Sequence, residues 1–64
     1  MRDPNRLDKF YDEMKELHKD NYPDIRFGQL ILNFSSWLIN EKSVDIFFPE
    51  EDKLLKYFEE YCYR

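Results

Sequence analysis

The sequence predicts an all-α fold in which one compact domain, 1–64, is built from three helices. Apolar residues recur at three- and four-residue spacing in three segments, and residues that begin or end helices border each segment. Only 44–48 suits an extended backbone, and no second strand pairs with it. Sixty-four residues are enough for one domain. We therefore expect a single core and no linker.

The first helix is expected over about 4–20. Asp3 is a good N-cap, and Pro4 suits the first helical position because the missing N–H is not needed there. Pro23 prevents continuation of the helix. The apolar face that these boundaries enclose consists of Leu7, Phe10, Met14 and Leu17.

The second helix is expected over about 24–41, with Asp24 as its cap, and it is unusually apolar. A stripe of about 100° suffices to face a core. Six residues supply that stripe: Phe27, Leu30, Ile31, Phe34, Trp37 and Leu38. Beside it lie four residues that we call the seam: Gly28, Leu32, Ser35 and Ile39. Because glycine costs about 1 kcal/mol in a helix relative to alanine, we expect a close contact there, made either by a helix of the same chain or by a second copy in a homodimer.

The third helix is expected over about 49–62, opened by Pro49 and an acidic first turn. Its inward face consists of Leu54, Leu55, Phe58, Tyr61 and Cys62. The connector 44–48 is apolar at four of its five positions. We expect one of the adjacent rings, Phe47 or Phe48, to close the end of the helical bundle and the other to be partly exposed. The alternative is that this corner anchors a partner protein.

A polar strip follows the second helix within an arc of about 80°. It consists of Arg26, Gln29, Asn33, Ser36 and Asn40. One interpretation is an ordinary solvent face. The other is that the first three residues contact a partner, since amide and guanidinium groups form directional hydrogen bonds.

Composition excludes several classes of function. The net charge of −4 disfavours nucleic-acid binding, which needs clustered Lys and Arg. No segment approaches the ~20 apolar residues of a membrane span, and the first residues show no signal-peptide pattern. Together with the lone thiol of Cys62, this predicts a cytoplasmic protein that needs no membrane.

Catalytic and metal-binding residues are equally scarce. The chain contains one histidine, His18, and one cysteine, Cys62. A structural zinc site needs four such ligands, so these two residues cannot complete one. His18 suits a helix-terminal cation, and Cys62 has no evident activating base. No phosphate-binding loop or nucleophile motif is present. We therefore expect no enzymatic activity, no catalytic residue, no metal and no cofactor.

An acidic row follows the first helix and contains Asp8, Asp12, Glu16 and Asp20. The simple interpretation is a solvated face, since lysines are interspersed nearby. The functional alternative is an inhibitor whose carboxylates take the place of phosphates.

Three sequence blocks resemble a family of short bacterial and phage-borne helical proteins with no established activity. The blocks are RDPNR at 2–6, PDIRFGQL at 23–30 with Asn33, and DIFFPEED at 45–52. The family shows an RDPxR start, a PDxRxGQL core and a DxFyxED turn, and this chain has Ile46 where the family has proline. The resemblance implies a compact helical domain and one polar network of Asp3, Arg6, Asp24, Arg26, Gln29 and Glu51.

These observations predict a small protein-binding or regulatory module without catalytic activity that pairs with a partner protein or with itself. The alternative is a phage-type inhibitor that binds a host protein through its acidic or aromatic surface.

Overall fold

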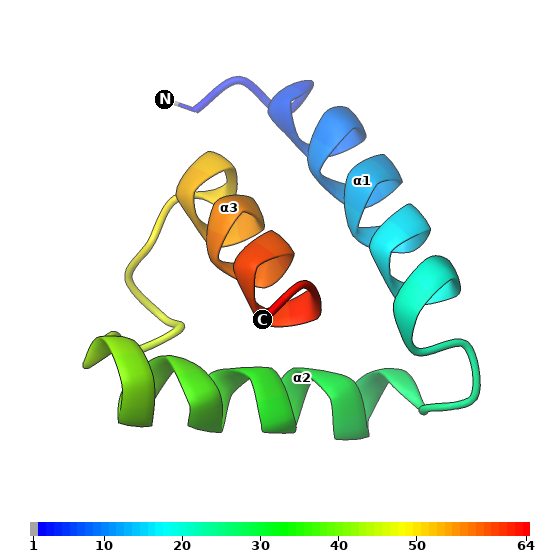
Figure 1. Cartoon of the computed structure of the whole chain (residues 1–64). Helices are drawn as coiled ribbons and strands as arrows, with labels where there is room; N and C mark the ends of the chain where they lie inside the picture. Colours follow the sequence, from blue (N-terminus) through cyan, green and yellow to red (C-terminus); the bar gives the residue numbers. More distant parts are fainter. Residues whose placement is uncertain (1) are drawn as a thin grey trace.

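The computed structural model describes residues 2–64 and confirms the predicted all-α, three-helix fold (Figure 1). Its helical segments are α1 (Arg6–Asn21), α2 (Phe27–Trp37), the π-helical turn η1 (Leu38–Lys42) and α3 (Glu51–Cys62). Helices α1 and α3 run side by side in the same direction, and α2 crosses near their C-terminal ends (Figure 1). Within the described residues there is no strand, so the connector 44–48 is a loop.

All three helices begin later than predicted, because local turns precede them. Before α1, the Asp3 carboxylate accepts a hydrogen bond from the Asn5 amide at 3.0 Å. The Asp3 carbonyl oxygen accepts one from the Arg6 amide at 3.2 Å. Asp3 thus caps a tight turn rather than the α-helix itself. Before α3, Glu50 has an extended backbone and occupies the N-cap position, so Pro49 lies outside the helix.

The predicted cap of α2, Asp24, is also wrong, since Arg26 occupies that position. The Ile25 amide donates to the Tyr22 carbonyl oxygen at 3.2 Å. His18 Nε2 lies 2.8 Å from the Ile25 carbonyl oxygen. These contacts hold 22–25 in a turn, and the helix starts only after it.

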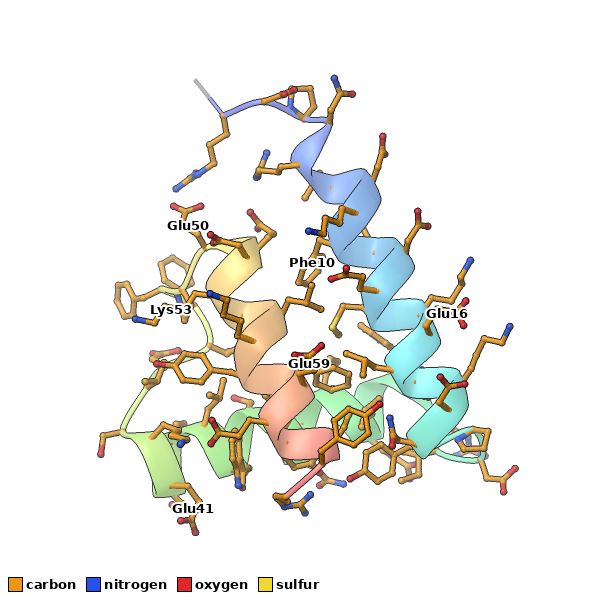
Figure 2. All side chains as sticks on the ribbon, turned by 45° about the horizontal axis from the view of Figure 1, so that its top comes forward. Phe10, Glu16, Glu41, Glu50, Lys53 and Glu59 are labelled. Carbon is orange, nitrogen blue, oxygen red and sulfur yellow. The ribbon has the colours of Figure 1, made fainter. Side chains whose placement is uncertain are left out.

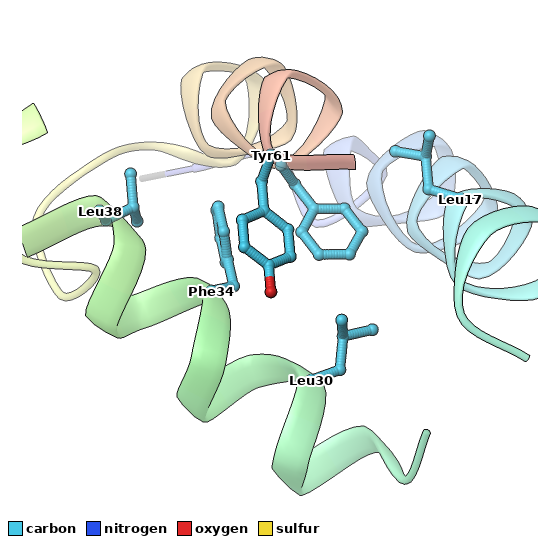
Figure 3. Packing of buried hydrophobic residues seen from close by; sticks show 6 residues of the cluster. Leu17, Leu30, Phe34, Leu38 and Tyr61 are labelled. Carbon is cyan, nitrogen blue, oxygen red and sulfur yellow. The ribbon is translucent and has the colours of Figure 1, made fainter. Parts of the chain in front are cut away.

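The core is small and rich in aromatic rings (Figure 3). Its buried members are Leu17, Leu30, Phe34, Leu38, Phe58 and Tyr61. Phe34 packs edge-on against Phe58 with ring centroids 5.0 Å apart, and its ring centroid lies 5.5 Å from that of Tyr61. All six residues belong to the faces that helical periodicity predicts. Phe27 is the exception within the predicted stripe of α2, because it lies at the helix start and is exposed.

Helix η1 ends at Ser43, whose backbone is left-handed with φ 55°. The Ser43 amide donates to the carbonyl oxygens of Ile39 and Leu38, and the Val44 amide donates to the Leu38 carbonyl oxygen at 3.1 Å. This arrangement satisfies carbonyl groups at the helix end. A residue with a Cβ atom is disfavoured in this conformation, in which glycine is ordinary.

Replacing Ser43 by glycine should therefore stabilise the protein, by about 1 kcal/mol. For a domain of this size, a gain of that order raises the Tm by about 4–8 °C. Thermal unfolding followed by circular dichroism measures the change. Ser43→Ala is the matched control, since alanine keeps the strained Cβ, and a Tm as high as that of Ser43→Gly would contradict the interpretation.

Candidate interaction surfaces

The seam is not covered by the rest of the chain. Leu32 and Ile39 expose 68% and 53% of their surface, and Ser35 is half-buried. Around Gly28, the position of an added Cβ atom has no neighbouring atom within 4 Å. The glycine therefore has no packing reason within one chain. Contact of the seam with another helix of the same chain is thus excluded. Contact with a second copy of the chain stays a prediction.

The polar strip faces outward along its whole length. Gln29 has a structural task, because its side-chain oxygen accepts a hydrogen bond from the Arg26 amide at 3.4 Å. None of the ion pairs found among residues 2–64 involves Arg26. Asn33 is exposed one turn further along α2. These three predicted contact residues are thus available to a partner.

The polar network that the family resemblance implies is split into two parts. Near the start of α1, the Arg6 Nε atom lies 2.7 Å from a Glu51 carboxylate oxygen. The same guanidinium group also donates to the Asp3 carbonyl oxygen at 3.1 Å. Arg26 and its neighbours lie at the turn after α1, at the opposite end of that helix. The prediction of a single network is therefore wrong.

Ion pairs join the starts of α1 and α3, which the parallel course of the two helices brings together. The pair of Arg6 and Glu51 is followed by Arg2 and Glu50, whose closest atoms are 2.6 Å apart. Hydrogen bonding from Arg6 lowers the pKa of Glu51 below its usual range. At the other end of α3, Lys42 pairs with Glu60 and lies 5.7 Å from the Trp37 ring centroid. These pairs connect neighbouring helices at the surface, where an ion pair contributes at most about 1 kcal/mol, and the core holds the helices together.

An open groove of about 800 Å³ lies between α1 and α3, and sequence reasoning missed it. Its lining includes the apolar side chains of Phe10 and Leu55, and Figure 2 shows Phe10 between the two helices. The charged lining residues are Asp3, Arg6, Lys9, Glu13, Glu50, Glu51, Asp52, Lys56 and Glu59. These residues come together only when the two helices pack. The sequence of either helix alone therefore does not predict the groove.

The Phe47 and Phe48 corner is exposed at both rings, at 80% and 75%. The expectation that one ring closes the helical bundle is therefore wrong. Asp45 explains the outcome, because its carboxylate accepts from the Phe47 amide at 2.9 Å and its carbonyl oxygen accepts from the Phe48 amide at 3.1 Å. The resulting turn places both rings at its outer side, while Val44 and Ile46 pack against the core.

The acidic row of α1 is exposed at all four of its carboxylates. Figure 2 shows Glu16 pointing away from the core. Nothing in the row is held by an ion pair within residues 2–64. The row is thus a solvated face that is also available to a partner.

Cys62 is half-buried, and burial raises the pKa of its thiol. A nucleophilic cysteine requires the opposite shift, since the thiolate is the reactive form. His18 Nε2 contacts the Ile25 carbonyl oxygen at the end of α1, which ties this side chain to the turn before α2.

Within residues 2–64, no group of three or more His, Cys, Asp or Glu side chains is arranged to hold a metal ion. In the same part of the chain, every helix falls short of the length and apolar character needed to cross a bilayer. Comparison with protein-family models, curated proteins and solved structures found no significant match.

Proposed function

We propose that this chain is a non-catalytic protein-binding module that uses the exposed seam of α2 as its contact face. The observation that carries the proposal is the exposure of Leu32 and Ile39 on one helix face beside an uncrowded Gly28. Large apolar side chains grouped on one face are typical of interaction sites, whereas singly scattered ones are ordinary.

The chain as a whole exposes more surface than its size requires, and the exposed rings of Phe47 and Phe48 contribute to this surface as well as the seam. A compact monomer of 8.0 kDa is expected to expose about 4,500 Å². This chain exposes 5015 Å², so roughly 500 Å² lies beyond what size alone requires. The raised pKa of Cys62 and the helix-end position of His18 support a role without catalysis.

A photo-reactive phenylalanine analogue placed at Leu32 tests this proposal in the cells that carry the gene. Irradiation should link this position covalently to a protein, because the proposed partner covers it. The analogue at Asn33 is the matched control, since one residue turns the helix face by about 100°. A higher adduct yield at Leu32 than at Asn33 is expected. Equal yields, or none at Leu32, would overturn the proposal.

A second candidate is an inhibitor that binds a host protein through the aromatic corner of Phe47 and Phe48. The exposure of both rings favours it, because buried aromatic anchors often dominate protein contacts. The analogue at Phe48 distinguishes the two candidates. Adducts of Phe48 without adducts of Leu32 would favour the corner.

A further inference from the structure

The spacing of the seam is self-complementary. Small and large residues alternate in the order Gly28, Leu32, Ser35 and Ile39. A two-fold axis perpendicular to α2 and passing between 33 and 34 pairs position 28 with 39, and position 32 with 35. Each large side chain of one copy then faces a small residue of the other. A surface that matches its own copy in this way is what a two-fold dimer requires.

The charge pattern permits the same pairing. The whole stretch 27–40 contains no charged residue, although the chain carries a net charge of −4. Two copies of α2 can therefore approach without placing like charges opposite each other. Small residues at two of the four seam positions allow helix axes to lie at about 8 Å, the close end of helix packing.

The seam is a small surface, because its two large side chains, Leu32 and Ile39, are 68% and 53% exposed and its other two positions are small. A contact confined to such a surface lies at the low end of interface sizes, which is typical of transient association. We therefore expect a dimer that dissociates on dilution.

We propose that a second copy of this chain occupies the seam, with the two α2 helices antiparallel and Leu32 of each copy facing Ser35 of the other. This inference rests on the proposed function, because it names the partner of the same face.

Cysteine pairing tests the orientation, with Cys62→Ala as the background that removes the natural thiol. Equal amounts of Gly28→Cys and Ile39→Cys chains are mixed and oxidised mildly, and the products are weighed by mass spectrometry. The mixed disulfide should exceed its statistical half share, since position 28 of one copy faces position 39 of the other. Gly28→Cys alone should not form a disulfide, because its two copies lie about 16 Å apart along the axis, whereas disulfides need Cα atoms within about 7 Å.

Asn40→Cys replaces Ile39→Cys as the matched control, and it should give no excess of mixed product. A Gly28→Cys disulfide would show a parallel pair and overturn the inference, as would a statistical mixture of products. If the photo-crosslinker at Leu32 forms adducts whose mass shows a different protein, the inference of a second copy is wrong, while the proposed function is retained. Loss of the Leu32 adducts would overturn both.

Discussion

Replacing Phe34 by alanine is expected to lower the free energy of unfolding by about 3–5 kcal/mol. The ring is 1% exposed and lies at the centre of the core, against Phe58 and Tyr61. A domain of 64 residues has a total stability of about 3–10 kcal/mol. The loss is therefore a large share of what holds the chain together, and it should lower the Tm by more than about 12 °C.

Urea unfolding followed by circular dichroism measures this loss directly. Phe48→Ala is the matched control, because it removes the same side chain from a position that is 75% exposed. It should change the free energy of unfolding by less than about 0.5 kcal/mol. Equal effects of the two substitutions would contradict the placement of Phe34 in the core.

Replacing Leu32 by glutamate is expected to abolish self-association and to leave the fold intact. Glutamate would place an unpaired charge in the proposed interface, near its own copy across the two-fold axis. Burying such a charge costs several kcal/mol, so the dissociation constant should rise at least about 100-fold. Monomer stability should change little, since Leu32 is 68% exposed and glutamate suits a helix almost as well as leucine.

Sedimentation velocity over a concentration series measures the loss of self-association, and a thermal melt of a dilute sample checks the fold. Asn33→Glu introduces the same charge on the polar strip and should leave association unchanged. If the Leu32→Glu variant associates as strongly as the unmodified protein, the seam is not part of the interface.

Helical periodicity was sufficient to predict the existence, order and inward faces of the helices. The core residues Leu30, Phe34 and Leu38 recur every four residues along one face, so packing against a core follows from their spacing. Phe58 and Tyr61, which are three residues apart, likewise share one face of α3. Such faces are local properties, which is why the sequence reveals them.

Helix starts and loop conformations depended on contacts that local patterns do not contain. Asp24 is a good capping residue, yet the contact of His18 with Ile25 draws that region into a turn. The orientation of the Phe47 and Phe48 rings is set by the hydrogen bonds of Asp45, although the hydrophobicity of the rings predicted burial. The groove beside Phe10 arises from the parallel packing of α1 and α3, which no single segment could indicate.

The seam combined both kinds of information. Its residues and their spacing were visible in the sequence, but only the structure shows that the chain leaves Leu32 and Ile39 exposed. The absence of any atom near the Cβ position of Gly28 likewise required the structure. Together these findings turn an apolar helix face into a proposed contact surface.

Sedimentation equilibrium of the unmodified protein tests the central claim most directly. The proposed two-fold contact predicts a mass that rises with concentration from 8.0 kDa toward twice that value. A mass that remains at 8.0 kDa up to millimolar concentrations would contradict it.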